Sequence, residues 1–357
     1  MWKETLDLYT DYLISQNGYA TATGLSRLLD GQISHDKVTR CLAQAEQGSK
    51  ELWSYAKSGV RESENDDGAL ILDDTIEEKP YTDENEIVCW HHSHTKGHHV
   101  KGMNILTSLV RYEDIAFPIG YEIVKKDQKF RDEKTQKEKR RASISKNTLF
   151  EKLVCQAVRN DVKFKWVLAD SWYGTTGNMS FIHYELKKCF IFGMKSNRHV
   201  SLTPAGQKRG KFQTVESLDL ENGECKVVYL KGMTLPVQLL KKVFTNKDNS
   251  TGTLYLVSND LTLDADRLYD VYKRRWRIEE FHKSIKQNAS LAKSPTKIER
   301  TQGNHVFASM IAYCKLEFLK IKTTLNHFAL KHKLLLRANM AAMAELRTLT
   351  AHAGASA

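Results

Sequence analysis

The chain has 357 residues, of which 41% are hydrophobic and 27% charged, and these proportions exclude a wholly disordered protein and predict two or three structural units. Its formal net charge of +11 favours a polyanionic partner, most commonly nucleic acid, although charge can also serve solubility alone. The six cysteines are scattered, which argues against a zinc ribbon and a disulfide framework. No signal-peptide pattern is present, and no apolar run is long enough to predict a membrane span. These features suit a reducing cytoplasm.

The first 66 residues are predicted to form short helices, because apolar residues recur there at helical spacing between polar turns. Ser34 is expected to cap the third helix. The pattern suits a helix-turn-helix-like DNA-binding domain at residues 1–66, and a small helical packing domain fits it equally well. The periodic positions are Leu6, Tyr9, Leu13 and Ile14, then Leu25, Leu28 and Leu29, then Val38, Cys41 and Leu42.

After an acidic linker at residues 62–67, the period changes to that of buried strands. The apolar run at residues 69–72 leads into Asp73 and Asp74 and predicts a strand that delivers carboxylates at its C-terminal end. A second buried strand at residues 164–169 ends in Asp170. Further strands are expected at residues 103–110 and 115–124, and a helix at residues 145–159.

The later part of the chain alternates between strand and helix patterns. Residues 190–258 carry short strand-like runs with turn signals, a long helix is predicted at residues 265–287, and the chain is helical from about residue 304. The basic run at residues 125–146 is expected to be a solvated loop that becomes a phosphate contact only if the protein binds DNA.

Two acids at strand ends and a glutamate on a late helix could together bind the metal ions that phosphodiester cleavage requires. Cleavage of a phosphodiester requires charge neutralisation on the attacking and leaving oxygens, which two divalent metal ions can supply. Mg²⁺ prefers oxygen ligands, so carboxylates from rigid elements suit it. Taken singly, each aspartate is better explained as a turn or capping residue, and the glutamate of an isolated helix as one half of an exposed ion pair with Arg275.

The predicted late helix places four polar residues on one side and an apolar face opposite. At 100° per residue, a stripe roughly 60° wide carries Tyr272, Arg275, Glu279 and Lys286. Ile278, Phe281 and Ile285 lie near the opposite side and are expected to pack on a sheet.

The spacing of these four residues resembles the Y-R-E-K signature of DDE transposases in the insertion-sequence-four superfamily. Three motifs strengthen the resemblance, which covers about residues 70–315: residues 71–75 (Ile-Leu-Asp-Asp-Thr), residues 167–174 (Val-Leu-Ala-Asp-Ser-Trp-Tyr-Gly) and residues 275–279 (Arg-Trp-Arg-Ile-Glu). It implies an α/β, ribonuclease H-like fold, a mixed sheet flanked by helices, with a β-rich insertion between Asp170 and Glu279. The expected domains are residues 1–66, a catalytic domain at 67–300 with the insertion at about 190–258, and a C-terminal helical region at 301–357.

By the same resemblance, Asp73, Asp170 and Glu279 hold two Mg²⁺ ions (Mn²⁺ as a substitute), and Tyr272, Arg275 and Lys286 contact DNA. Asp73 and Asp74 alternate across a strand, so only one of them can face the metals, and the Asp-x-Thr pattern of the family favours Asp73.

Two other features leave alternatives open. The segment from Cys89 to His99 contains zinc-ligand types, including His91, His92 and His94, at spacings that match no familiar structural site, and a polar loop near the active-site edge is favoured. Trp172 and Trp276 flank the acidic positions and serve either as packing residues or as platforms for a displaced base.

The resemblance implies a cut-and-paste transposase of a bacterial insertion sequence, acting in the cytoplasm on the nucleoid. Its partners are double-stranded DNA, as terminal inverted repeats and target, and a second copy of the chain in a homodimer on DNA. A nicked strand then attacks a second phosphate, with a hairpin step implied by the signature alone. The alternatives are a ribonuclease H-like nuclease without strand transfer and a domesticated DNA-binding protein.

Overall fold

The computed structural model describes residues 2–93, 95–246 and 248–354, which form two compact units. The helical unit comprises Met1–Ala56, Glu77–Asp83 and Phe281–Ala357, and the sheet unit comprises Lys57–Ile76 and Glu84–Glu280. No described helix is both long enough and apolar enough to cross a bilayer.

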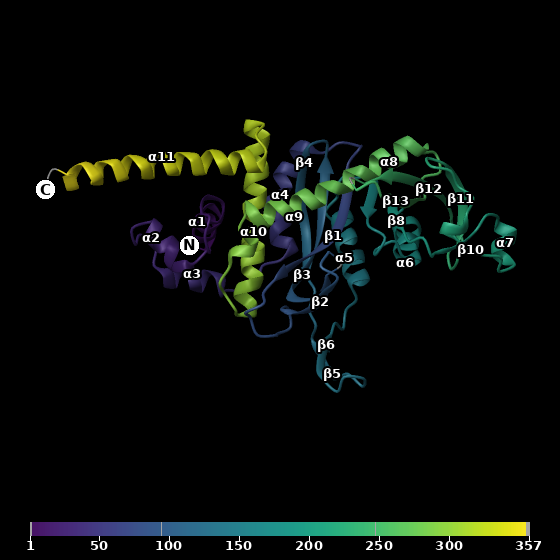
Figure 1. The fold of residues 1–357 in the computed structure, drawn as a ribbon, viewed down its shortest axis with the longest axis horizontal. Coiled ribbons are helices and arrows are strands. Elements are labelled where there is room, and N and C mark those ends of the chain that lie inside the picture. The colour runs from purple at the N-terminus through teal and green to yellow at the C-terminus, as the bar shows by residue number, and fades with distance from the viewer. Residues whose placement is uncertain (1, 94, 247, 355–357) are drawn as a thin grey trace. The chain divides into compact units, whose positions relative to one another are not determined.

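The sheet unit is built on one 11-stranded mixed sheet with helices against it (Figure 1). Its strands follow the order β10-β9-β11-β12-β13-β8-β7-β1-β3-β2, and β4 pairs with β3. The predicted α/β, ribonuclease H-like class is therefore confirmed. The strands are β1 (Ala69–Glu78), β2 (Cys89–Ser93), β3 (His98–Tyr112), β4 (Ile115–Ile123), β7 (Trp166–Ala169), β8 (Cys189–Met194), β9 (His199–Ser201), β10 (Gln213–Thr214), β11 (Cys225–Leu230), β12 (Pro236–Thr245) and β13 (Thr251–Ser258).

Three parallel strands form the centre of this sheet. β7 pairs in parallel with β1 on one side and with β8 on the other. The four residues of β7 and the first four of β1 are all buried, which explains their unbroken apolar sequence, because a parallel strand is covered on both faces. The sequence predicted β1 to end at the aspartates, but the strand continues to Glu78, so Asp73 and Asp74 lie within it.

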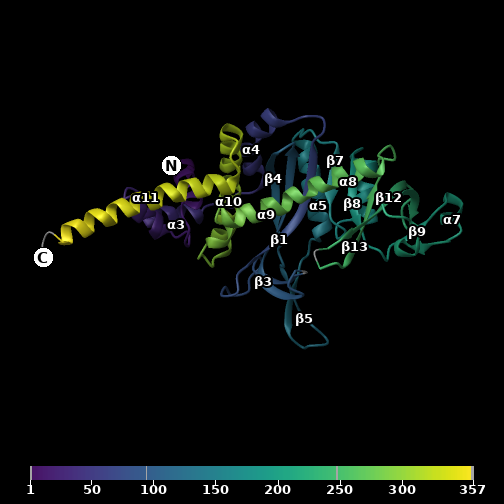
Figure 2. The same cartoon turned by 45° about the horizontal axis from the view of Figure 1, so that its top comes forward.

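The predicted β-rich insertion extends the same sheet. β13 pairs antiparallel with β8, and β12 and β11 follow as antiparallel neighbours. The turned view shows this antiparallel part continuing from the parallel strands (Figure 2). The insertion is therefore part of the main sheet, and it lies in the chain between Asp170 and the helix that carries Glu279.

Helices of the sheet unit agree with the sequence prediction at one place and differ at another. Helix α5 (Lys146–Arg159) begins after Ser145, whose hydroxyl accepts a hydrogen bond from the Thr148 amide. The predicted helix at residues 265–287 is interrupted: α8 (Ala265–Lys273) passes through a 3₁₀ turn (Arg274–Trp276) into α9 (Arg277–Gln287). The shorter segments are α6 (Thr176–Ser180), a π-helical turn (Phe181–Glu185), α7 (Pro204–Lys208) and a 3₁₀ turn (Val215–Ser217).

The basic run at residues 125–146 was expected to be a loop, and this prediction was wrong in part. The run folds into an antiparallel hairpin of β5 (Gln128–Arg131) and β6 (Glu138–Arg141), which forms a separate 2-stranded sheet. Four cross-strand pairs supply the backbone hydrogen bonds that composition alone did not reveal.

N-terminal and C-terminal helices together form the helical unit. Asn304 of α10 donates to the carbonyls of Leu42 and Gln44 and accepts from the Gln47 amide, and Tyr9 bonds the buried His305 at 2.9 Å. Side-chain hydrogen bonds thus join segments far apart in the chain. The helices are α1 (Trp2–Ser15), α2 (Ala22–Leu28), α3 (His35–Leu42), the first part of α4 (Ser49–Ser63), a 3₁₀ turn (Leu291–Lys293), α10 (Glu299–Thr323) and α11 (His327–Gly354).

The N-terminal sequence pattern predicted most of this packing. The Ser34 hydroxyl accepts the Lys37 amide as the expected cap of α3, and Tyr9, Leu13 and Ile14 are buried. Leu28 departs most from the prediction, since 61% of its surface is exposed, and Leu6 and Leu29 are only half-buried.

Candidate active site

Two of the predicted acids come from neighbouring parallel strands in matching register. Ile71 of β1 pairs with Leu168 of β7, and the same register continued by two residues aligns Asp73 with Asp170. Side chains at matching positions of parallel strands point to the same face of the sheet. Asp170 follows the end of β7, where its Oδ1 accepts the amides of Trp172 at 3.0 Å and Tyr173 at 3.3 Å. These bonds orient the carboxylate.

The third acid, Glu279, is connected to Asp73 through an arginine. Arg275 donates from Nη1 to Oδ2 of Asp73 at 2.9 Å, and its Nη2 lies 3.6 Å from Oε1 of Glu279. The guanidinium carbon lies 5.8 Å from the ring centroid of Tyr272, which is buried. The structure therefore brings together five of the six predicted site residues around one cluster in the sheet unit: Asp73, Asp170, Tyr272, Arg275 and Glu279.

Lys286, the sixth predicted residue, belongs to the helical unit. Burial lowers the pKa of its ammonium, and the negative charges of Glu77 and Glu78 act in the opposite direction. The sequence had predicted one uniform helix that carries both residues 272 and 286. The 3₁₀ turn interrupts that helix between them. In the turn, Arg274 bonds Asp67 while Arg275 bonds Asp73, so adjacent side chains are held by different tertiary partners.

Asp74 has a different environment from Asp73, as alternation along a strand requires. Its carboxylate accepts from Lys146 at 2.9 Å, from the Tyr173 hydroxyl at 2.6 Å and from the Asn104 amide at 2.6 Å. Burial raises the pKa of Asp74, but Lys146 and the hydrogen bonds outweigh it, and the net pKa is lowered. The environment of Asp74 thus favours its ionised form, and its oxygens are already occupied by protein donors.

The surroundings of Asp73 stabilise its ionised form less than those of Asp74 do. Burial, together with the negative charge of Asp170, raises its pKa to about 7, although Arg275 acts in the opposite direction. Asp74 and Glu279 raise it further. A buried carboxylate surrounded by other carboxylates is an environment that a bound cation would relieve.

The donor set can be compared with what a divalent ion requires. Asp73, Asp170 and Glu279 offer only carboxylate oxygens, the ligands that Mg²⁺ prefers, and Oδ2 of Asp170 has no hydrogen-bond partner in the described part of the chain. Within residues 2–93, 95–246 and 248–354, no three acidic, His or Cys side chains are already arranged as a metal cage. Arg275 contacts two of the acids, Asp73 and Glu279. The three carboxylates therefore fit a divalent ion by their chemistry once the Arg275 guanidinium releases the Asp73 carboxylate.

Close approach of two glycines shapes the wall of this cluster. A Cβ added to Gly193 of β8 would lie 2.8 Å from the Ser171 amide nitrogen and 3.2 Å from the Tyr272 hydroxyl. A Cβ on Gly174 would lie 2.5 Å from the Gly193 carbonyl oxygen. The loop after Asp170 and the ring of Tyr272 therefore occupy space that any larger residue at 193 would fill.

Sequence reasoning missed Lys146 and Asn104, because neither belongs to a motif or to a periodic stripe. Lys146 is the first residue of α5, and its ammonium lies 4.0 Å from the ring centroid of Trp172. Trp172 is half-buried against Lys146 and Tyr173, as a packing residue would be, whereas Trp276 is 65% exposed.

The histidine-rich segment lies mainly on strands, which corrects the predicted polar loop. His91 and His92 are in β2, His98 and His99 are in β3, and the rings of His92 and His99 pack across the strands with centroids 5.3 Å apart. Burial, Lys126 and Lys146 lower the pKa of His91 to about 4. Of the other expected zinc-ligand types, Cys89 is buried in β2, and His94 lies outside the described residues.

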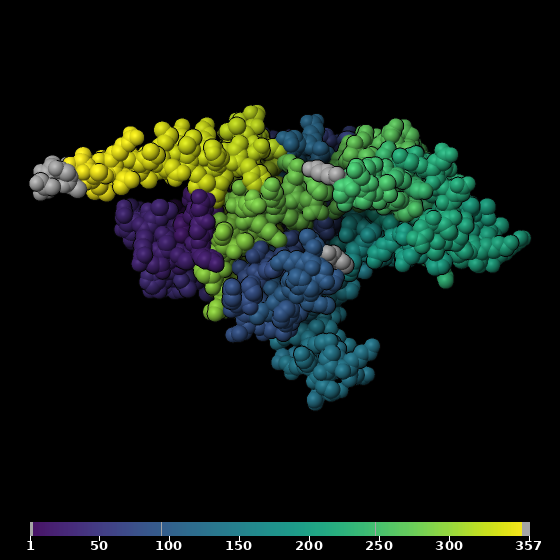
Figure 3. Space-filling model, in the orientation of Figure 1, coloured from purple at the N-terminus to yellow at the C-terminus, as the bar shows by residue number. Residues whose placement is uncertain are grey.

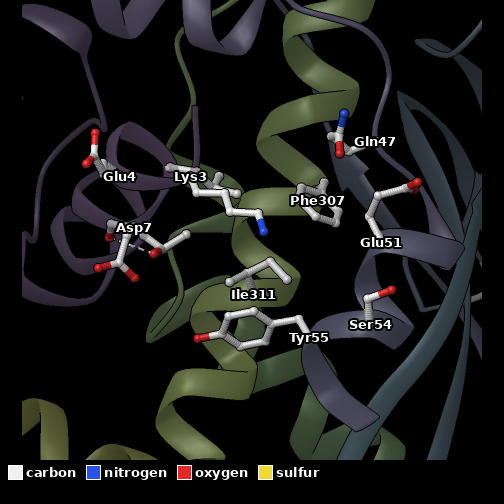
Figure 4. A pocket seen from close by; sticks show the side chains of 11 residues that line it. Lys3, Glu4, Asp7, Gln47, Glu51, Ser54, Tyr55, Phe307 and Ile311 are labelled. Atoms are coloured by element: carbon white, nitrogen blue, oxygen red, sulfur yellow. Dashed lines mark hydrogen bonds between the residues drawn. The ribbon is translucent and has the colours of Figure 1, made fainter. Parts of the chain in front are cut away.

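A cavity of about 570 Å³ lies within the helical unit, not among the carboxylates (Figure 4). Phe307 and Ile311 of α10 and Tyr55 of α4 give it apolar walls, and Lys3 reaches across it. Its lining contains acidic residues of α1 and α4 but no carboxylate of the cluster described above.

Two models of known protein families match the chain. Residues 136–315 match the family described as "Transposase DDE domain", and residues 3–212 match the family described as "DDE superfamily endonuclease". No curated protein matches the chain.

Proposed function

Because this chain belongs to the DDE transposases, enzymes of metal-dependent DNA cleavage and strand transfer, we propose that it moves an insertion sequence by a cut-and-paste route. In this proposal the catalytic acids are Asp73, Asp170 and Glu279. The subgroup is the insertion-sequence-four superfamily, on the strength of the Tyr272, Arg275, Glu279 and Lys286 spacing.

One observation carries the assignment of the acids: a single arginine contacts the carboxylates of both β1 and α9, while the strand register aligns Asp73 with Asp170. The alternative first acid, Asp74, has Lys146, Tyr173 and Asn104 as partners. A carboxylate that accepts three protein donors has little capacity left for a metal ion, which supports Asp73.

Two Mg²⁺ ions, held by the three acids, would supply charge neutralisation and a more acidic water at neutral pH. Asp170 is pre-oriented for this role by the amides of residues 172 and 173. When no metal ions are bound, Arg275 neutralises the acids. With Tyr272 and Lys286, it is proposed to bind the phosphates beside the cut. Arg275 therefore exchanges carboxylate for phosphate when DNA and metal bind.

The proposed reaction has two kinds of step. In the first, water attacks phosphorus at the element end, the bond from phosphorus to the 3′ oxygen breaks, and a 3′-hydroxyl and a 5′-phosphate result. In the second, that 3′-hydroxyl attacks another phosphodiester, one phosphorus–oxygen bond forms and one breaks, and a new 3′-hydroxyl is released. The opposite strand is the proposed first acceptor, which gives a hairpin. Water then attacks the hairpin phosphodiester and its bond to the 3′ oxygen breaks, which restores the 3′-hydroxyl for the last attack, on target DNA.

The proposed partners are two DNA ends and a second copy of the chain. Two terminal inverted repeats must be held together for excision, so a homodimer on double-stranded DNA is expected. Residues 1–66 and the basic hairpin are proposed to hold the repeats largely through phosphates, in the cytoplasm where the nucleoid lies.

The direct test uses purified protein, a labelled duplex that carries the element end, and Mg²⁺ or Mn²⁺. We expect cutting at the terminus, none in EDTA, and joining when target DNA is added. Asp170→Asn and Glu279→Gln should abolish cutting and retain DNA binding. Glu280→Gln is the matched control, because this neighbour is exposed and pairs with Arg277 at 2.6 Å.

Cutting that survives either substitution would refute the assignment of the acids. Cutting without joining would identify a nuclease, and binding without cutting a domesticated DNA-binding protein.

A further inference from the structure

The β5–β6 hairpin has no structural role in the core of the sheet unit. It forms its own 2-stranded sheet, and seven of its eight strand residues are exposed. It projects from the rest of that unit as a narrow arm (Figure 3). Two strands alone are only marginally stable in water, so such an arm does not serve to stabilise the fold.

The arm is strongly basic, and part of that charge is unpaired. Residues 128–141 contain seven Lys or Arg and three Asp or Glu. Lys139 pairs with Asp132 at 2.7 Å, and Lys129 pairs with Glu138 at 2.9 Å. Lys134 lies in the turn and Lys137 follows it, and both are exposed and make no ion pair with any described residue.

The two faces of the arm differ. Directly opposed pairs share a face, so Gln128, Phe130, Lys139 and Arg141 lie on one side, where all four are exposed. On the other side Arg140 is half-buried at the root, where it donates to the carbonyl of Lys126. The first face is therefore the more accessible one.

Arg141 on the open face is held in place before any ligand binds. Its guanidinium lies 5.6 Å from the ring centroid of Phe130, and its Nε donates to the amide oxygen of Gln128 at 3.0 Å. Arg and Gln are the side chains that read guanine and adenine edges, and an aromatic ring can contact the thymine methyl group. Phosphate binding alone would not require this arrangement.

We propose that the β5–β6 hairpin enters the major groove of the element-end DNA, with the face of Gln128, Phe130 and Arg141 toward the base edges. Lys134 and Lys137 at the turn then contact phosphates. Adjacent strands lie about 4.8 Å apart, and a two-stranded ribbon fits the major groove, about 12 Å wide, but not the minor groove, about 6 Å wide. This inference rests on the proposed transposase function, since it takes the element end as the DNA.

The test measures binding of the full chain, without divalent ions, to a duplex bearing the terminal inverted repeat and to a duplex of scrambled sequence. Lys134→Ala/Lys137→Ala should weaken binding to both and reduce the slope of log affinity against log salt by about 2. Arg141→Ala should reduce the preference for the repeat by about tenfold or more. Lys208→Ala/Lys211→Ala, which removes two exposed charges near α7, is the control and should leave the preference for the repeat unchanged.

Dimethyl sulfate footprinting identifies the groove, because it reports guanine N7 in the major groove and adenine N3 in the minor groove. We expect guanine protection by the unaltered protein that Arg141→Ala loses. Protection of adenine N3 alone, or unchanged affinity, salt slope and preference in all hairpin variants, would overturn the inference. Since no step requires cleavage, a negative result is distinct from failure of the catalytic proposal, which the metal-dependent cutting assay measures separately.

Discussion

The adjacent aspartates of β1 should respond in opposite ways to the same substitution. Burial and the charge of Asp170 raise the pKa of Asp73 to about 7. Burial also acts against the charge of Asp74, but Lys146 and the hydrogen bonds lower its pKa overall. The folded protein thus holds one carboxylate at a cost in stability and gains stability from the other. Asp73→Asn and Asp74→Asn separate the two.

The sign for Asp73 follows from a folded-state pKa above the ordinary value of 3.8. The stability that its protonated form contributes is fully present below about pH 3.8 and is lost as pH rises to about 7. The difference between these values corresponds to about 4 kcal/mol. Asparagine does not titrate, so Asp73→Asn should be up to about 4 kcal/mol more stable than the unaltered protein at about pH 8, and nearly equal to it at about pH 4.

For Asp74 the folded-state pKa is lowered, so its stabilisation is present above the ordinary pKa and is lost as pH falls below it. Asp74→Asn leaves the half-buried Lys146 without its anion and Tyr173 without a charged acceptor. The expected loss is roughly 2–4 kcal/mol near neutral pH, decreasing under acid conditions.

Urea unfolding in EDTA, at about pH 4 and about pH 8, measures both free energies. Mg²⁺ at about 100 times its dissociation constant should then stabilise the unaltered protein by about 2.7 kcal/mol and leave Asp73→Asn unchanged. If Asp73→Asn is less stable than the unaltered protein at about pH 8 in EDTA, the folded protein does not raise the pKa of Asp73 as described. The same applies if both variants shift in one direction.

Three further outcomes are expected from other residues. Gly193→Ala should lower the cleavage rate by about tenfold or more, because its Cβ would press on Ser171 and Tyr272. Gly177→Ala should cut normally in the labelled-duplex assay, because the nearest atom that its Cβ would meet, apart from its chain neighbours and its own helix backbone, is the Thr175 hydroxyl oxygen at 3.8 Å. Equal rates for the two variants would contradict the close approach at Gly193. Lys146→Met should reduce the free energy of unfolding by roughly 1–3 kcal/mol at neutral pH and by less in acid. Urea titration at both pH values measures this difference. A loss of stability that is independent of pH would argue against the ion pair with Asp74. Glu317→Ala should lower the free energy of unfolding by roughly 3–5 kcal/mol, because Glu317 is fully buried and its carboxylate lies 2.7 Å from Nε2 of His327. A decrease below about 1 kcal/mol in the same urea titration would count against this contact.

Local patterns in the sequence predicted the elements that carry the site. Unbroken apolar runs predicted the strands that become β1 and β7, since only strands covered on both faces tolerate such runs. The apolar face of Ile278, Phe281 and Ile285 is buried as predicted. The sequence also indicated an insertion of short strands between Asp170 and Glu279, which the structure confirms.

Patterns within one element could not predict contacts between elements. The 3₁₀ turn at Arg274–Trp276 contains neither Gly nor Pro, and it occurs where two arginines bind partners on other segments. The hairpin at residues 128–141 was hidden for a related reason, because its exposed strands carry no alternation of apolar and polar residues.

Sequence patterns alone predicted the candidate residues of the site: two acids that follow the apolar runs of buried strands, and an arginine four residues before a glutamate in a helical segment. The difference between the two adjacent acids arises from contacts between distant segments of the folded chain. Asp73 lies among carboxylates with one arginine, and Asp74 lies among Lys146, Tyr173 and Asn104. The physical reason is that a carboxylate's pKa depends on burial and on charges brought close by distant segments, and no local pattern records those distances.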